Sequence, residues 1–480
     1  MKKNVVFSTY SRMSVVSRAT LWFMVSSFVQ KGLSFITTPI FTRLMSQEQF
    51  GLYSVYTSWL QIMVIISTFR LDYSVFNKGM SKYPEDRDGY TSSMLGLTTV
   101  ITTILFGLYL IFSRQINSIT ELSTVIMCAM FVELYANCAV SFWSLREKYD
   151  FRYKAVVFYT LATAIFSSAL GIVSVIAFED KGVARILSGV LVHALGGMAI
   201  YYVIFKRSKK FLSLDYTKYA VVFNIPLIPH YFSTYMIEQA DRIMIQKLVS
   251  FEAAALYSVA YTVGGLVKIF TAALTNTLIP LQYRLLEKKD YRSLNKNIIM
   301  VMLSVVCLLF LIALAGPEII LILGGEEYMP ALGVIPPVAA SVYFSFLYTL
   351  IANIEFFYGK NKFAMKISMV GAVVNVLLNL LLIPQFGFVV AAYTTLFSYI
   401  IYALGHMFYV KRILKTEDAE SGLNNRLLLG MGIMSMVGCI LLGFLYSTRI
   451  FRVILGILIL FVVFINRKTL LGIFKKKTQN

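Results

Sequence analysis

Residues 43–56 read RLMSQEQFGLYSVY, and residues 247–260 read KLVSFEAAALYSVA. At a constant offset of 204 residues, seven of the fourteen positions are identical, and Arg43 corresponds to Lys247. Agreement of this kind without a gap exceeds what a shared apolar bias produces, so we interpret it as an internal duplication. Each copy is a polar turn between two long apolar segments. The sequence therefore predicts two homologous helical halves.

The composition indicates a polytopic membrane protein. Of the 480 residues, 58% are hydrophobic and only 14% are charged, and a soluble protein of this length could not bury so much apolar surface. The formal net charge of +20 fits basic loops on the cytoplasmic side better than nucleic-acid binding. The four cysteines lie inside apolar segments, without the spacing of a metal site or a disulfide framework. The N-terminus has no signal-peptide pattern.

Apolar segments recur along the whole chain. A bilayer crossing needs about 20 helical residues, and on that measure we predict fourteen transmembrane helices: 19–42, 50–74, 90–112, 120–143, 155–178, 183–205, 219–246, 254–280, 298–323, 330–357, 367–383, 387–410, 427–446 and 453–470. The short loops alternate between basic and nearly uncharged, and both termini belong with the basic set. The positive-inside rule then places both termini in the cytoplasm.

The duplication divides these helices into two repeats. We expect an N-terminal half over residues 1–218 with helices 1 to 6, and a C-terminal half over 219–410 with helices 7 to 12. Residues 411–480 hold helices 13 and 14 and a basic tail. Because six is even, both repeats have the same orientation and are related by an axis along the membrane normal. By fold analogy, this parallel arrangement is typical of alternating-access transporters.

Four basic residues lie outside the loops, at Lys31, Arg70, Arg242 and Lys268. A cation at the centre of a membrane helix costs about 2.5–3.5 kcal/mol, so each needs a partner or water. Lys31 and Lys268 lie near mid-membrane on polar helix faces, one in each half, and predict a cationic substrate cavity; the alternative is a structural ion pair. Arg70 is a weaker cavity candidate because it can reach the headgroups, and Arg242 can likewise anchor at the interface.

Acidic residues in the same segments are candidates for ion coupling. Glu133 is near the centre of helix 4, while Glu238 and Asp241 share a polar stripe of helix 7. Pro226 and Pro229 interrupt that helix and free backbone carbonyls. Four further polar residues can be explained without a functional role. Glu355 is as well explained as a solvated acid at the membrane boundary, and Glu318 lies at the outer rim. His193 and His230 could relay protons, but each is also explained as a polar side chain packed between helices.

Signals for an enzyme are poor. Asp86-Arg87-Asp88 has the DxD spacing of many glycosyltransferases, but it lies in a short loop that reads better as a solvated charge run. The chain has no phosphate-binding glycine loop, zinc spacing or nucleophile elbow, and no loop long enough for an ATP-binding domain. We therefore expect no catalytic residues, no metal and no cofactor.

Several stretches carry a family resemblance. Ser17-Arg18-Ala19-Thr20, Lys31-Gly32 and residues 38–53 (TPIFTRLMSQEQFGLY), followed later by residues 224–229 (NIPLIP) and Asp241-Arg242, resemble the bacterial polysaccharide flippases. These Wzx-type O-antigen translocases belong to the multidrug/oligosaccharidyl-lipid/polysaccharide exporter superfamily. The specific motifs lie in helices 1–2 and 7–8, while the topology covers the whole chain.

The resemblance implies a substrate and partners. The substrate would be an undecaprenyl-pyrophosphate-linked repeat unit of O-antigen, lipopolysaccharide or capsule, moved from the cytoplasmic to the periplasmic leaflet by alternating access, with proton or sodium coupling through Glu133, Glu238 or Asp241. Lys31 and Lys268 match the cationic lumen of this family in character, whereas Arg70 and the three acids match no fixed position of the family. From their place in the sequence, Lys31, Lys268 and Arg70 are the candidates for holding the anionic headgroup. Membrane lipids and a polysaccharide polymerase complex are the candidate partners. A multidrug ion antiporter and a membrane glycan polymerase or ligase are the alternatives.

Overall fold

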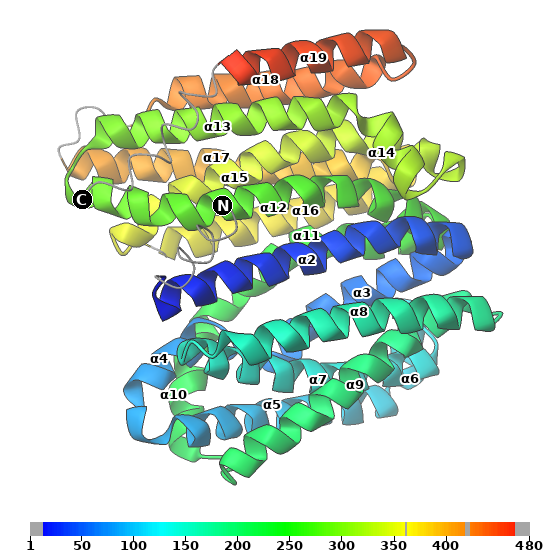
Figure 1. Ribbon diagram of the computed structural model, residues 1–480, viewed down its shortest axis with the longest axis vertical. Helices are drawn as coiled ribbons and strands as arrows, with labels where there is room; N and C mark the ends of the chain where they lie inside the picture. Colours follow the sequence, from blue (N-terminus) through cyan, green and yellow to red (C-terminus); the bar gives the residue numbers. More distant parts are fainter. Residues whose placement is uncertain (1–12, 361, 418–422, 466–480) are drawn as a thin grey trace, which may run out of the picture. The chain divides into compact units, whose positions relative to one another are not determined.

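The computed structural model describes residues 13–465 apart from 361 and 418–422. Across these residues the chain is almost entirely helical and has no β-strand (Figure 1). The predicted all-α class is confirmed. Each of the fourteen predicted segments coincides, for most of its described residues, with one long helix, or with two in the case of 219–246: α2 (Val15–Leu44), α3 (Gln47–Thr68), α5 (Arg87–Ile111), α7 (Thr124–Tyr149), α8 (Tyr153–Ala177), α9 (Lys181–Arg207), α10 with α11 (Leu214–Asn224 and Ile228–Leu248), α12 (Phe251–Glu287), α13 (Tyr291–Leu314), α15 (Ile335–Phe357), α16 (Lys362–Phe386), α17 (Val390–Thr416), α18 (Asn425–Phe444) and α19 (Arg449–Ile465).

Short helices lie between these long ones: α4 (Ser74–Lys82), α6 (Ser113–Thr120), α14 (Gly316–Leu323), η1 (Pro84–Asp86), η2 (Ile225–Leu227) and η3 (Glu326–Val334). Three predicted helices are therefore interrupted, and the one predicted over 219–246 is broken by η2 between α10 and α11. The helix predicted over 50–74 ends at Thr68, because Phe69 and Arg70 adopt left-handed backbone angles with φ of 51° and 50°. The helix predicted over 298–323 ends at Leu314, and Pro317 then starts α14 in the first turn, where its missing N–H costs nothing.

Ten helices of the described part of the chain are long and apolar enough to cross a membrane: α3, α5 with η1, α7, α8, α9, α12, α13, α15 with η3, α16 and α18. The protein is therefore a multi-pass membrane protein. The other four predicted crossings fall outside this group for visible reasons. Charged side chains interrupt α2 and α11, polar side chains are frequent in α17, and α19 has only 17 described residues.

The chain folds into two compact units, which divide within α11 between Tyr235 and Met236. The first unit therefore includes α10 and η2, and α10 packs there against α4 and α5. The division of the repeats at residue 218 stays a prediction.

The same helix pairings occur inside each unit. In the first unit α9 packs against α7 and α8, and α3 packs against α5 and α7. In the second unit α17 packs against α15 and α16, and α12 packs against α13 and α15. These are equivalent pairs under the offset of the repeat. The helices α18 and α19 both pack on α13 of the second unit.

The repeated stretch is a helix start in both units. The Ser46 hydroxyl accepts a hydrogen bond from the Gln49 backbone N–H, and the Gln49 side chain accepts one from the Ser46 N–H, which completes a capping box at α3. The Ser250 hydroxyl accepts from the Ala253 N–H at α12. Serine and glutamate recur in both copies because a side-chain acceptor and a negative charge stabilise the N-terminal turn.

Candidate functional site

Lys31 lies in the middle of α2 with its side chain exposed. It makes no recorded hydrogen bond or ion pair with any residue that the structure describes. Ser27 and Ser34 of the same predicted face are also exposed, whereas Thr38 is buried. Lys31 therefore keeps its charge available on a polar strip of α2.

Lys268 of α12 has a carboxylate partner. Its Nζ atom lies 3.0 Å from Glu238 Oε1 of α11 and 3.4 Å from the Tyr261 hydroxyl. Both members of the pair are partly accessible, with 28% and 42% of their side chains exposed. A predicted substrate cation and a predicted coupling acid are thus one ion pair. Arg242 lies nearby, with Nε 3.1 Å from Ser258 Oγ and its guanidinium over the Tyr261 ring.

Arg70 lies where α3 breaks. Its guanidinium is 4.9 Å from the ring centre of Tyr73, 5.6 Å from that of Tyr231 and 5.5 Å from that of Tyr235. Asp72 is only loosely paired with it, at 3.9 Å. The aromatic faces stabilise the cation without neutralising it.

A second helix break meets the first. Pro226 lies in the single 3₁₀ turn η2 between α10 and α11, and Pro229 lies in the first turn of α11. Asn224, just before the turn, is fully buried, and its side-chain amide donates a hydrogen bond to the Phe69 carbonyl. That carbonyl belongs to the left-handed pair that ends α3, so one amide joins the two interruptions.

Asp241 is the centre of a buried polar cluster in the second unit. Its carboxylate accepts hydrogen bonds from the Tyr257 hydroxyl (2.5 Å), the Thr395 hydroxyl (2.6 Å) and the Asn379 amide (2.7 Å). Asn375 donates to the Thr395 hydroxyl at 3.2 Å, and the Thr394 hydroxyl donates to Asn379. The cluster draws on α11, α12, α16 and α17. It concentrates oxygen atoms around one negative charge.

Sequence reasoning found Asp241 but missed its companions on α16 and α17. A signal existed, because Asn375 and Asn379 are four residues apart in an otherwise apolar segment and so share one helix face. Tyr257 belongs to the repeated stretch itself, where it reads as a packing residue.

Glu133 of α7 is buried and lies between two donors. Its Oε1 is 2.6 Å from His193 Nδ1 of α9, and its Oε2 accepts from the Tyr56 hydroxyl of α3 at 2.6 Å. In the second unit Glu355 of α15 and His406 of α17 form a similar pair at 2.7 Å. Glu355 is fully buried, so its interpretation as a solvated boundary acid is wrong. His406 was missed.

Arg185 was also missed among the intramembrane cations. It is buried in the first turns of α9, with its guanidinium 4.6 Å from the Phe41 ring centre and 4.8 Å from that of Tyr53. Its Nη2 donates to the Tyr53 hydroxyl at 3.3 Å. Tyr53 occupies the position of Tyr257 in the other copy of the repeat.

Two loop features have structural roles. Asp86 caps α5 and accepts from Lys210 and Tyr216, while Asp88 pairs with Arg146. The DxD spacing is therefore occupied by ionic contacts within the first unit. Glu318, which we predicted to be a rim acid, forms a two-pronged pair with Arg452 of α19, at 2.5 and 2.9 Å.

Residues 16–286 match the family described as "Polysaccharide biosynthesis protein". The chain belongs to this family. The matched range runs from the first turn of α2 almost to the end of α12, so it contains both copies of the repeated turn. Family membership confirms the resemblance that the motifs of helices 1–2 and 7–8 indicated.

Two curated relatives extend the comparison. The chain is 22% identical over 371 residues to "Lsg locus putative protein 1" of Haemophilus influenzae, which covers 75% of this chain and 90% of that protein. It is 23% identical over 406 residues to "Probable low-salt glycan biosynthesis flippase Agl15" of Haloferax volcanii, covering 82% and 83%.

Solved structures show the fold of this family member. "Lipid II flippase MurJ, inward closed conformation" superposes with a TM-score of 0.66 at 14% identity, over 94% of this chain and 99% of that chain. An inward-facing "multidrug resistance MATE family transporter of the MOP superfamily" superposes with a TM-score of 0.59 at 11% identity, over 82% and 96%.

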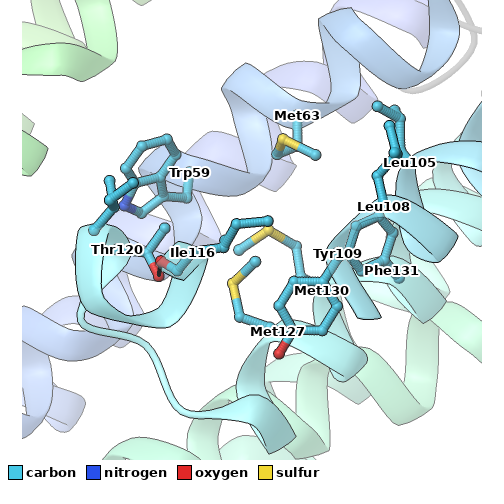
Figure 2. Close-up of a pocket in the computed structure, with 11 residues that line it drawn as sticks. Trp59, Met63, Leu105, Leu108, Tyr109, Ile116, Thr120, Met127, Met130 and Phe131 are labelled. Carbon is cyan, nitrogen blue, oxygen red and sulfur yellow. Dashed lines mark hydrogen bonds between the residues drawn. The ribbon is translucent and has the colours of Figure 1, made fainter. Parts of the chain in front are cut away.

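The first unit of this polysaccharide biosynthesis protein also holds an apolar cavity of about 250 Å³ (Figure 2). Helices α3, α5, α6 and α7 form it, and the residues that line it are Trp59, Met63, Leu105, Leu108, Tyr109, Ile116, Ile119, Thr120, Met127, Met130 and Phe131. No charged side chain lines it, so it suits an apolar chain and not a phosphate or a sugar.

Proposed function

We propose that this protein is a flippase that moves an undecaprenyl-pyrophosphate-linked oligosaccharide from the cytoplasmic to the periplasmic leaflet of the bacterial inner membrane. The family match over residues 16–286 carries the proposal. The relative named as a probable glycan biosynthesis flippase and the fold likeness to a lipid II flippase support it. In this role the chain is a transporter and not an enzyme. The glycan that it moves would be a repeat unit of O-antigen or capsule.

Three cations would hold the anionic headgroup: Lys31, Arg70 and Lys268. Lys31 is exposed and has no carboxylate partner among the described residues, so it offers a full charge to a pyrophosphate or an acidic sugar. Arg70 adds a guanidinium that aromatic rings frame, which suits a headgroup carrying both phosphate and sugar rings. The polyprenyl tail needs no polar partner and stays in apolar surroundings.

The pair of Lys268 and Glu238 links substrate binding to coupling. An anionic headgroup competes with Glu238 for the Lys268 ammonium, because both seek the same positive charge. When the headgroup binds, the Lys268 ammonium is drawn away from Glu238, and the Glu238 carboxylate gains affinity for a proton or a cation. Substrate binding and ion binding therefore favour each other at this point.

Asp241 is the strongest candidate for the ion site. Hard monovalent cations such as sodium prefer oxygen ligands, and here the Asp241 carboxylate lies beside the hydroxyl oxygens of Tyr257 and Thr395. The carboxamide of Asn379 donates to the same carboxylate through its nitrogen. The ion would be transported cargo and not a resident cofactor. Asp241 lies in α11, the helix that also supplies Glu238, so ion binding and release of Lys268 act on the same helix.

Orientation and partners complete the proposal. The alternation of basic and uncharged loops places both termini in the cytoplasm. Alternating access would come from movement of one repeat against the other. A polysaccharide polymerase complex in the same membrane would consume the translocated repeat units.

The second candidate is a multidrug ion antiporter, which the fold likeness to a MATE transporter favours. A cationic drug needs an acidic binding surface, however, and the exposed Lys31 opposes it. A glycan polymerase or ligase is the other class considered, and it needs a large extracytoplasmic loop that the sequence does not provide.

Gene deletion separates these functions. Loss of the flippase removes surface polysaccharide while lipid-linked repeat units accumulate on the cytoplasmic leaflet. A deletion strain that exports single, unpolymerised repeat units would instead indicate a polymerase. Unchanged polysaccharide together with new drug sensitivity would indicate the antiporter.

A further inference from the structure

The chain has three histidines, and two of them pair with buried glutamates. Glu133 and His193 join α7 to α9 in the first unit, and Glu355 and His406 join α15 to α17 in the second. These helices are equivalent in the two repeats. The two pairs lie at different positions along their helices and differ in how far their side chains are exposed. This difference in exposure separates the roles that the two pairs can have.

In the first pair the acid, Glu133, is buried and the base, His193, is partly exposed. Glu133 has 7% of its side chain exposed, and each of its oxygens accepts a hydrogen bond of 2.6 Å, one from Tyr56 of α3 and one from His193 of α9. The His193 side chain is 36% exposed. Neither Lys nor Arg forms a recorded ion pair with Glu133 among the described residues.

The second pair is sealed. The side chains of His406 and Glu355 are 2% and 0% exposed. Tyr348 of α15 stacks on the His406 ring at 5.7 Å, and Phe363 of α16 covers it edge-on at 6.2 Å. Glu355 Oε2 is buried and has no hydrogen-bond partner among the described residues. His406 is the one recorded ionic partner of Glu355 in that part of the chain.

We propose that Glu133 and His193 form a proton-exchange site, whereas Glu355 and His406 form a fixed contact that holds α15 to α17. With Nδ1 directed at Glu133, the far nitrogen Nε2 of His193 is the atom that takes a proton from water or returns it. Protonation yields an imidazolium beside a carboxylate, and deprotonation leaves a neutral ring whose Nδ1–H still donates to Glu133. The Tyr56 hydroxyl keeps the carboxylate hydrogen-bonded in both states.

The sealed pair cannot act in this way. A proton that left His406 would have to cross the rings of Tyr348 and Phe363, and a carboxylate with one unpaired oxygen would remain inside the protein. The proposal rests on the proposed function in one respect: exchange at His193 would serve translocation as a second coupling step beside the Asp241 cluster.

Because the chain has only three histidines, imidazole ¹⁵N signals can be followed one by one in the purified, full-length protein. Substitution of each histidine by glutamine assigns its signal. When the pH is varied from about 5 to 8, the range in which a free imidazole changes its charge, we expect the His193 signal to change and the His406 signal to stay constant. Glu133→Gln should shift the midpoint of the His193 titration, whereas Glu355→Gln, the matched control, should leave it in place.

A constant His193 signal across this range, or a His406 signal that titrates alongside it, would overturn the proposal. Two of the three histidine substitutions are enough to assign the wild-type spectrum by elimination, so one variant that fails to fold does not block the test. Proton exchange is measured without a glycan and is therefore independent of the proposed function. In cells, His193→Gln should remove the pH dependence of surface-glycan export, and His406→Gln should instead lower the yield of folded protein.

Discussion

Replacement of Asp241 by asparagine should abolish sodium-dependent stabilisation while leaving the fold intact. The carboxylate accepts three hydrogen bonds, from Tyr257, Thr395 and Asn379. Asparagine has the same shape, and the two hydroxyl donors can rotate to accept from its amide. We therefore expect Asp241→Asn to cost about 1 kcal/mol in stability. Asp241→Ala would strand several buried donors at about 1–3 kcal/mol each.

The effect on the ion is larger, because the only formal negative charge of the cluster disappears. A ligand that binds only the folded state stabilises it by RT ln(1 + [L]/Kd), which gives about 2.7 kcal/mol at a concentration of 100 times Kd. Above Kd, each tenfold rise in sodium should add about 1.4 kcal/mol in the wild type. The slope should be close to zero in Asp241→Asn.

Thermal unfolding of the purified protein measures this slope, with NaCl replaced by choline chloride at constant ionic strength. Glu318→Gln is a suitable control, since it removes a carboxylate of the same unit outside the cluster and should keep the wild-type slope. Equal sodium dependence in the wild type and in Asp241→Asn would refute the assignment of the ion site. If the sodium dependence disappears in Glu318→Gln as well as in Asp241→Asn, the effect comes from the loss of any negative charge and the assignment of the ion site to Asp241 is refuted.

Three further outcomes are expected. Lys31→Glu should abolish complementation of a deletion strain and Lys31→Arg should retain part of it, measured as surface glycan at matched protein levels; full activity of Lys31→Glu would exclude a cationic headgroup site. Hydrogen bonds from Arg452 lower the pKa of Glu318 below its usual 4.5, so this pair stabilises the fold above that value and loses its effect as the pH falls through the lowered pKa. Glu318→Ala removes the carboxylate partner of the buried Arg452 guanidinium and should lower the free energy of unfolding by about 1–3 kcal/mol near neutral pH, and by less in acid. Thermal unfolding at several pH values measures this loss. Reporter fusions at Gly325 should read periplasmic and those at Lys289 cytoplasmic; a cytoplasmic signal at Gly325 would contradict the predicted orientation.

The helices were predictable because length and apolar composition are strong, local signals. The interruptions were harder. Nothing in the sequence around Phe69 and Arg70 marks a left-handed backbone, since neither residue is glycine or asparagine. The break is stabilised from elsewhere, by the Asn224 side chain that donates to the Phe69 carbonyl. A conformation imposed by a tertiary contact cannot be read from its own segment.

Candidate residues were predictable singly and their partners were not. The cost of charge in a membrane identifies Lys268, Glu238, Glu133 and Asp241 as unusual, but only the fold shows that the first two are one ion pair. Glu355 was undervalued because its position near a helix end suggested solvent, while the structure seals it with His406. Depth along a helix is a poor guide to burial when another helix covers that end.

The repeated stretch shows how far a duplication can guide functional assignment. Its serine starts a helix in both copies, so the structural role of that position is shared. Its tyrosine is not used in the same way, because Tyr53 accepts a hydrogen bond from the buried cation Arg185 and Tyr257 donates one to the buried anion Asp241. A phenol can do either, since its oxygen is both a donor and an acceptor. The duplication therefore conserved a hydroxyl at one place in each half, and the charge beside it diverged in sign. Equivalent positions of the two repeats should be expected to share their backbone role and to differ in the ions that they contact.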